Sequence, residues 1–414
     1  MTLRPLLATL ALVLAASVTP AVGAADWPVF HGPDGSNKSP DTGLLKEWPE
    51  GGPKLIWQAE GLGEGFSSVT VANGMVYTAG NKDEKTIVTA LDMAGKPVWQ
   101  AANGGAWTKD HPGTRSTPTI DGDRLYHESP IGNLICLNAK TGEEVWSLNI
   151  LKEFEGENII WALAESPIID GDRLICCPFG KKASVVAIDK MTGKVVWAAE
   201  GTGDKAGYGT PVLVEYGGLR MVLTMNQKAV VGVDADSGTL LFRFPHETKY
   251  DVNALIPLFH EGQVFVSSGY GAGSQLIKLS VNGKNVSAEQ VWENKKFDNH
   301  HGGVILVDGY VYGTNFRGQW MCLDWKSGEV KWTDKGIGKG SLTYADGLLY
   351  GFNERENDRT VGLIKPSPDG YELISQFQIP EGGKGNSWAH PVVIGGRLYV
   401  RHGDFLFVFD VKAD

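Results

Sequence analysis

The order of apolar and polar positions between residues 166 and 197 predicts four short β-strands in series. Residues 166–169 and 173–177 flank Asp170-Gly171, a dipeptide typical of tight hairpin turns. A third apolar stretch, residues 185–188, leads through a Thr-Gly turn into a last strand that ends at Trp197. The pattern therefore predicts one antiparallel four-stranded sheet.

The same pattern recurs along most of the chain. The aromatic residue that ends each unit lies 40 to 51 residues after the previous one, at Trp99, Trp146, Trp197, Phe242, Trp292, Trp332 and Phe377. Each unit also contains a hairpin dipeptide: Asn73-Gly74, Asp121-Gly122, Asp170-Gly171, Gly217-Gly218, Glu261-Gly262, Asp308-Gly309, Asp346-Gly347 and Gly395-Gly396. Because a single sheet cannot bury both of its faces, this repeat predicts that neighbouring units pack on one another.

The two ends of the chain each hold part of one unit. Residues 55–59 resemble a fourth strand that lacks its first three, and residues 390–400 and 405–410 supply three strands that lack a fourth. An N-terminal strand that completes the C-terminal sheet would close a ring and remove the exposed sheet edges. We therefore predict an all-β fold, an eight-bladed β-propeller of four-stranded antiparallel blades, with residues 25–54 as a tail and residues 55–414 as a single domain.

The first residues have the pattern of a secretory signal peptide. Arg4 precedes an apolar run over residues 6–18, and the small residues Val22-Gly23-Ala24 follow it. We predict a signal peptide over residues 1–24, with cleavage after Ala25 as the alternative. No cysteine lies just after the run to carry a lipid, and no later apolar run is long enough to cross a membrane as a helix. We expect an exported monomer, either periplasmic or secreted.

The net charge narrows the classes of possible partner, and the cysteines bear on whether the chain has disulfide bonds. The 414 residues carry a net charge of −10 at pH 7, and this sign argues against a nucleic-acid partner. The four cysteines do not suggest a disulfide framework for a chain of this length. We interpret Cys176-Cys177 as two buried thiols, because successive side chains of a strand point to opposite faces.

The repeated signature Leu-Asp-x-x-Thr-Gly-Lys/Glu-x-x-Trp resembles the tryptophan-docking motif of the pyrroloquinoline quinone (PQQ) type of propeller repeat. The opening Asp26-Trp-Pro-x-Phe-x-Gly-Pro33 is similar to that of short exported quinoprotein-like propellers. The resemblance covers nearly the whole mature chain and implies two kinds of function. The fold includes quinone-dependent alcohol and sugar dehydrogenases, and also the propeller lipoprotein of the outer-membrane β-barrel assembly machinery, which carries no cofactor.

One ring of residues is a candidate for function. In a propeller, the residues just before each innermost strand surround one mouth of the channel, where several blades contribute to one concavity. At this position the sequence has polar, aromatic and titratable residues: Phe66, Arg115, Trp161, Glu165, Tyr208, Asn253, His300, His301, Lys339, Trp388 and His390. Two interpretations stay open, a solvated rim and a ligand-binding rim. For His300 and His301 we favour hydrogen bonding within the rim over a metal site, because adjacent strand residues diverge.

A quinone-dependent enzyme would need a more specific set of groups. The resemblance to the dehydrogenases implies Glu165 and Asn253 as Ca²⁺ ligands beside PQQ, and Asp298 as the catalytic base. The chain lacks the Gly-rich context around the asparagine, the aromatic-Asp-x-Asp run and the long insertions of those enzymes. We therefore expect no cofactor, and a binding or scaffold module that presents its rim to an envelope protein or a carbohydrate. The alternative is a PQQ- and Ca²⁺-dependent dehydrogenase that oxidises an alcohol or a sugar.

Overall fold

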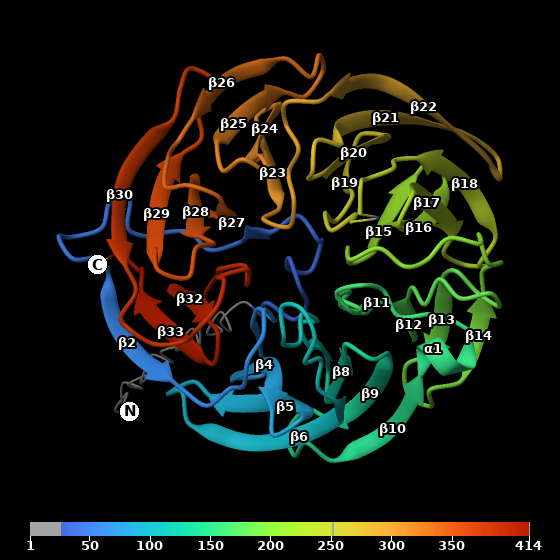
Figure 1. Cartoon of the computed structure of the whole chain (residues 1–414), viewed down its shortest axis with the longest axis horizontal. Helices are drawn as coiled ribbons and strands as arrows, with labels where there is room; N and C mark the ends of the chain where they lie inside the picture. The colour runs from blue at the N-terminus through green and yellow to red at the C-terminus, as the bar shows by residue number, and fades with distance from the viewer. Residues whose placement is uncertain (1–25, 251, 414) are drawn as a thin grey trace, which may run out of the picture.

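The computed structural model describes residues 26–250 and 252–413. Over these residues the chain forms eight sheets arranged as a ring, which confirms the predicted eight-bladed propeller (Figure 1). Each blade has four antiparallel strands, and the seventh blade gains a short fifth strand from the N-terminal tail. The predicted signal peptide, residues 1–24, lies outside the described residues.

The first four blades follow the chain in order. Blade 1 consists of β3 (Thr70–Ala72), β4 (Met75–Lys82), β5 (Lys85–Asp92) and β6 (Pro97–Gly105). Blade 2 consists of β7 (Thr119–Asp121), β8 (Arg124–Glu128), β9 (Asn133–Asn138) and β10 (Glu144–Asn149), and a single-turn helix, α1 (Ile150–Glu153), follows it. Blade 3 consists of β11 (Ile168–Asp170), β12 (Arg173–Cys176), β13 (Val186–Asp189) and β14 (Val195–Ala198). Blade 4 consists of β15 (Val212–Tyr216), β16 (Leu219–Met225), β17 (Ala229–Asp234) and β18 (Leu240–Pro245).

The last four blades complete the ring. Blade 5 consists of β19 (Leu258–His260), β20 (Gln263–Ser268), β21 (Gly273–Asn282) and β22 (Asn285–Asn294). Blade 6 consists of β23 (Val304–Val307), β24 (Tyr310–Thr314), β25 (Trp320–Asp324) and β26 (Val330–Asp334). Blade 7 consists of β27 (Gly340–Ala345), β28 (Leu348–Asn353), β29 (Thr360–Lys365) and β30 (Glu372–Gln378), with β1 (Lys38–Ser39) parallel to β27. Blade 8 consists of β31 (Val392–Ile394), β32 (Arg397–His402), β33 (Phe405–Asp410) and β2 (Lys54–Ala59).

The ring closes as the sequence predicted. Strand β2 pairs antiparallel with β33, with Lys54 opposite Asp410 and Ala59 opposite Leu406. Figure 1 shows the blue β2 strand on the outer side of the red β33 strand. The two ends of the chain therefore share one sheet, and that sheet has no edge left open by a missing fourth strand.

Each blade is fastened to the next by the aromatic residue of its outer strand. The Trp146 indole N–H donates to the Lys190 carbonyl of the next blade at 3.0 Å. The corresponding bonds from Trp57, Trp99, Trp197, Trp292 and Trp332 measure 2.8–3.1 Å. A turn glycine of the next blade lies under the rings of Trp57, Trp99, Trp146, Trp197 and Trp292: Gly193 has φ of +73°, and a Cβ there would stand 2.9 Å from the Trp146 ring. The repeated Thr-Gly turn is thus required both by the backbone conformation and by the docked indole.

The N-terminal tail packs on the body of the ring before it reaches β2. Trp27 is fully buried and pairs through its backbone with Val71 of blade 1, and Leu44 and Trp48 join the apolar core of blades 7 and 8. Among the described residues, no helix has the length and apolar character needed to span a membrane.

Candidate functional site

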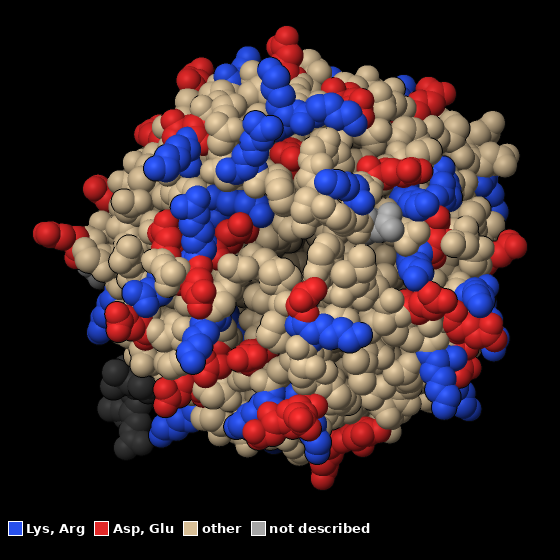
Figure 2. All heavy atoms as spheres, viewed as in Figure 1, with Lys and Arg blue, Asp and Glu red and all other residues tan. Residues whose placement is uncertain are grey.

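The loops that precede the innermost strands surround a cavity of about 190 Å³ at one mouth of the channel. Its lining residues come from the tail and from the approaches to most of the blades: Phe30, Phe66, His111, Arg115, Trp161, Ala164, Tyr208, Val252, Ala254, Tyr270, His300, His301, Trp388 and His390. Figure 2 shows the hollow at the centre of the ring. Eight of the eleven residues in the predicted rim therefore line one common space.

Aromatic side chains form most of the wall of this mouth cavity. The Trp388 ring lies 4.5 Å from the Phe66 ring, 4.8 Å from His111 and 4.9 Å from His301, measured between centroids. On another side of the cavity, Trp161 lies 6.2 Å from Tyr208. Since aromatic rings offer large rigid surfaces with few rotatable bonds, this wall can hold an apolar group at low entropic cost.

Arg115 contributes the one guanidinium to the wall. Its two terminal nitrogens donate to the backbone carbonyls of Gly113 at 2.9 Å and His111 at 2.8 Å, and its carbon lies 5.3 Å from the Phe66 centroid. Burial lowers the pKa of Arg115 to about 10, so it keeps its charge at neutral pH. The residue fixes the loop that carries His111 and leaves a cation at the edge of the cavity.

A chain of histidines connects the tail to the mouth. His31 Nε2 lies 2.9 Å from His390 Nδ1, and His390 Nε2 lies 2.8 Å from the His301 carbonyl, to which it donates. His301 Nδ1 in turn lies 2.9 Å from His300 Nδ1. Burial lowers the pKa of all four, and it lowers that of His390 to about 4. These imidazoles are therefore neutral at pH 7 and act as hydrogen-bonding groups.

The sequence-predicted rim residue Lys339 lies just outside the cavity. Its Nζ is 3.1 Å from Glu354 Oε1 and 3.3 Å from His300 Nδ1, and Glu354 Oε2 is 3.1 Å from His301 Nε2. Burial acts to raise the pKa of Glu354, but the hydrogen bonds and charges of His301 and Lys339 outweigh it and lower the pKa to about 2. Because His301 is neutral at pH 7, the ammonium of Lys339 is the cation that balances the Glu354 carboxylate.

Asn253 lies beneath the cavity and is fully buried. Its amide nitrogen donates to the carbonyls of Asn226 at 2.8 Å and His246 at 3.0 Å. Its amide oxygen accepts a hydrogen bond from Ser268 Oγ at 2.5 Å. Both ends of the side chain are therefore used to hold three segments of blades 4 and 5 together.

Glu165 is also buried beneath the cavity, in a pair with Glu128. Glu165 Oε1 accepts a hydrogen bond from the Cys177 backbone N–H at 2.6 Å. Burial raises the pKa of Glu128 well above its usual value, and the neighbouring Glu165 raises it further. Burial also raises the pKa of Glu165, against the hydrogen bond from Cys177 that lowers it. The pair therefore favours protonation, and the adjacent Cys176 and Cys177 are both buried free thiols.

Asp298 lies on a neighbouring pocket between blades 5 and 6 and does not line the mouth cavity. Its two carboxylate oxygens accept hydrogen bonds from the backbone N–H groups of Gly271, at 2.9 Å, and Phe316, at 3.1 Å. The side chain thus ties together two loops of adjacent blades.

Comparisons with known proteins agree with this architecture. A family model described as "Outer membrane protein assembly factor BamB" matches residues 84–334, which is more than half of the 414-residue chain. The chain belongs to this BamB family. Its sequence is also 30% identical over 134 residues to a quinoprotein ethanol dehydrogenase of Pseudomonas aeruginosa, a match that covers 31% of this chain and only 20% of that enzyme.

Solved structures support the same fold for this BamB-family chain. BamB from Moraxella catarrhalis aligns with a TM-score of 0.60 at 15% identity, over 86% of this chain and 99% of that one. A quinohemoprotein alcohol dehydrogenase from Comamonas testosteroni aligns with a TM-score of 0.62 at 13% identity, over 95% of this chain and 82% of that one. At these identities the likeness shows the fold alone.

The residues of this BamB-family chain do not fit a Ca²⁺-bound quinone. A Ca²⁺ ion needs several free oxygen ligands around one point, whereas the Asn253 oxygen already accepts from Ser268 and Glu165 favours protonation. In the part of the chain that the structure describes, no group of three or more His, Cys, Asp and Glu side chains is placed to hold a metal ion. Asp298, the proposed base, belongs to a different pocket.

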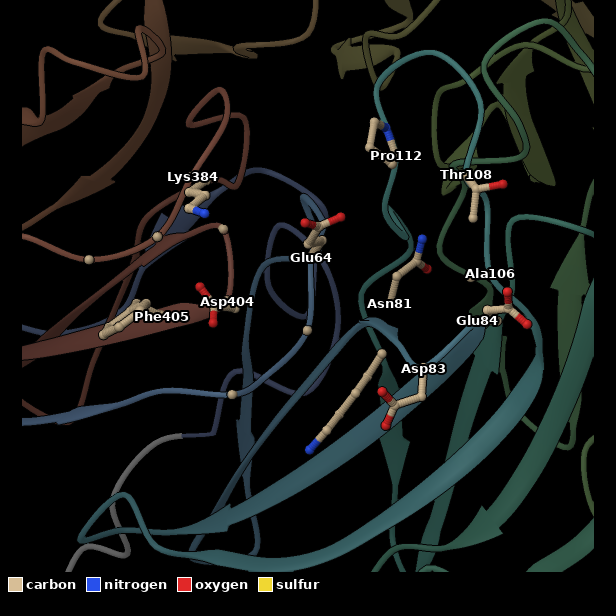
Figure 3. Close-up of a pocket in the computed structure, with 16 residues that line it drawn as sticks. Glu64, Asn81, Asp83, Glu84, Ala106, Thr108, Pro112, Lys384, Asp404 and Phe405 are labelled. Carbon is tan, nitrogen blue, oxygen red and sulfur yellow. The ribbon is translucent and has the colours of Figure 1, made fainter.

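A larger pocket of about 750 Å³ lies beside the mouth, where blades 8 and 1 meet. We call it the closure pocket; its described charged residues are the carboxylates Glu64, Asp83, Glu84 and Asp404 and the lysines Lys82 and Lys384. Figure 3 shows the Glu64 carboxylate between the loop that carries Lys384 and the loop that carries Pro112. The pocket is therefore acidic and open to solvent.

Sequence reasoning missed several residues of the mouth cavity. Phe30 comes from the tail, whose sequence has no period that would tell which part of the ring each tail residue reaches. Tyr270 comes from the β20–β21 hairpin, and Glu354, which lies outside the cavity beside His301 and Lys339, follows β28 at the equivalent hairpin position. The signal that was available is the aromatic or charged residue at the tip of the second hairpin of a blade, because that tip faces the same mouth as the approach to the innermost strand.

Proposed function

We propose that this BamB-family propeller is an envelope binding protein whose mouth cavity holds an aromatic or apolar side chain of a protein partner. The observation that carries the proposal is the cavity itself, with its aromatic wall built from the tail and the approaches to most blades. The description of the family, an outer membrane assembly factor, supports a partner protein and a location in the cell envelope. A carbohydrate is the competing ligand.

The size of the mouth cavity favours a single side chain. Pockets for drug-sized ligands measure about 300 to 1,000 Å³, and an apolar cavity of about 150 Å³ accepts benzene. The mouth cavity, at about 190 Å³, lies between these and suits one aromatic ring or one branched aliphatic side chain. Residues of that kind, seated in a pocket, supply most of the binding energy in protein interfaces.

The test is selection of a phage-displayed peptide library on the purified protein, followed by affinity measurements on the selected peptides. We expect peptides with a shared aromatic residue, and we expect Trp388→Ala to weaken them about thirtyfold, the effect of a residue worth about 2 kcal/mol. The matched control is Ile160→Ala, since Ile160 is 60% exposed and does not line the cavity. Melting curves check that both variants are folded.

One result would contradict this proposal. Selected peptides without an aromatic or large apolar residue, bound equally by Trp388→Ala, would remove the mouth cavity from consideration.

The second candidate function, a quinone-dependent dehydrogenase, is favoured by the 134-residue match to the ethanol dehydrogenase. Dye-linked turnover of an alcohol or a sugar that appears only with added PQQ and Ca²⁺ would favour this candidate, against the lack of fit described above.

A further inference from the structure

A second open pocket, of about 660 Å³, lies beside the mouth cavity between blades 5 and 6. We call it the blade 5–6 pocket. Its described lining residues are Lys249, Tyr250, Tyr270, Gly271, Lys295, Lys296, Asp298, Asn315, Phe316, Arg317, Gln319, Met321 and Thr333. Tyr270 lines this pocket and the mouth cavity, so one side chain forms a wall between them.

The described lining of this pocket is strongly basic. It includes the cations Lys249, Lys295, Lys296 and Arg317 and the single carboxylate of Asp298, in a chain whose net charge is −10. Asp298 is 8% exposed, and both of its oxygens accept backbone hydrogen bonds. The Asp298 carboxylate is therefore used by backbone N–H groups. The four cations outnumber it, so the pocket lining has a net positive charge.

These cations are available to a ligand. Lys249, Lys296 and Arg317 are exposed, and within the described ranges none of them has an ion pair. Lys295 pairs with Glu293, near the end of β22, at 2.5 Å. A ligand with several carboxylates can therefore form ion pairs with at least three cations without breaking an existing ion pair.

The aromatic rings in the pocket contact one another and two lysines. Tyr250 and Tyr270 meet edge to face at 5.0 Å, and Tyr270 lies 4.4 Å from Phe316. Lys249 lies 5.1 Å from the Tyr250 centroid, and Lys339 lies 4.9 Å from the Phe316 centroid. Tyr250 is the most exposed of these rings, at 43%, and a lysine lies against it, so charge is the main feature that the pocket offers a ligand.

We propose that the blade 5–6 pocket binds an acidic peptide segment, rich in Asp and Glu. Lysine side chains are flexible point charges, which suit carboxylates spaced along an extended chain; compact phosphate sites favour the paired donors of arginine. Here three lysines and one arginine surround an open space of about 660 Å³. The site is separate from the mouth cavity, so it stands whether or not a partner side chain occupies the mouth.

The test measures binding of a fluorescein-labelled hexaglutamate peptide to the purified protein by fluorescence anisotropy at low and physiological salt. We expect binding that weakens steeply with salt, and a loss of about tenfold or more in the double reversal Lys296→Glu with Arg317→Glu. The control is Lys194→Glu with Lys326→Glu, which changes the net charge by the same amount on exposed turns outside the pocket. We expect this control to stay within about twofold of the unaltered protein.

Each other outcome overturns the proposal. Equal losses in the pocket variant and the control would mean that hexaglutamate responds only to overall charge. Absence of binding at low salt would mean that the pocket holds no acidic peptide. An oligogalacturonate of the same charge that binds more tightly than hexaglutamate would assign the pocket to an acidic sugar. Trp388→Ala, measured alongside, separates this site from the mouth, because it should leave hexaglutamate binding unchanged.

Discussion

The closure pocket and the blade 5–6 pocket lie at two equivalent junctions of the ring and carry opposite charge. At the junction of blades 8 and 1, the cation Arg401 is 1% exposed and donates to the carbonyls of Gly63, at 2.9 Å, and Ser67, at 3.2 Å. At the junction of blades 5 and 6, a carboxylate, Asp298, holds the backbone and the cations stay at the surface.

The difference follows from what each junction must do. Arg401 lies on β32, which comes from the C-terminal end of the chain, and its buried guanidinium bonds carbonyls near the N-terminal end at once, so this one side chain ties the two ends together. Burial lowers the pKa of Arg401 to about 9, against the charge of Asp404, which still leaves it charged at neutral pH. Blades 5 and 6 follow one another along the chain and bring no two ends together, and three of their four cations have no ion pair among the described residues.

The largest effect we expect comes from removing the buried cation. Arg401→Met would leave several buried carbonyls of blade 1 without donors, and we expect the free energy of unfolding to fall by about 3 to 5 kcal/mol. Arg317→Met at the other junction should change it by less than about 0.5 kcal/mol, because Arg317 is exposed. Urea unfolding of both variants measures the difference. Similar values for the two arginines would show that the junctions are not specialised in this way.

Acid should destabilise the protein through the buried histidines at the mouth, of which His390 belongs to the blade 8 side. His390 has a folded pKa of about 4, below its unfolded value, so its contribution to stability is present above pH 6.5 and is lost as pH falls towards 4. We expect this histidine alone to cost about 3 kcal/mol at pH 4. In His390→Asn the drop in melting temperature between pH 7 and pH 4 should therefore be smaller. The matched control is His260→Asn, because His260 is exposed and does not line the mouth cavity.

The smallest effect concerns interaction between the two pockets. They share no lining residue, and charges further apart than about 8 Å are screened at physiological salt. The double change Glu64→Gln with Glu84→Gln should therefore alter hexaglutamate affinity by less than about twofold at that salt, and by more at low salt. A large effect at physiological salt would place the peptide across both pockets and end the simple comparison between them.

Much of the fold followed from the sequence because the repeat encodes it locally. The Gly193 turn and the Trp146 ring contact each other in three dimensions, and the same contact recurs at four other junctions, so the joint recurrence of glycine and tryptophan marks most of the ring. The pairing of residues 55–59 with residues 405–410 was predictable because neither end could complete a blade alone.

The site was less predictable because the loops before the innermost strands have no fixed direction. Trp388 and Arg115 turn towards the cavity, whereas Asn253 turns down to satisfy the carbonyls of Asn226 and His246. A buried backbone must find hydrogen-bond partners, and nothing in the local sequence tells which polar residue of a loop will supply them. The tail residues Phe30 and His31 reach the mouth only through tertiary packing.

The pairing of β2 with β33 sets the order in which the protein can mature. A strand near the start of the chain must wait for a partner roughly 350 positions later, and the chain has to bring them together against the entropy of a very long loop. During synthesis, the incomplete ring therefore carries an unpaired edge until its final strand emerges. Helper proteins that shield such an edge would act on this protein late, at the step in which the two ends meet.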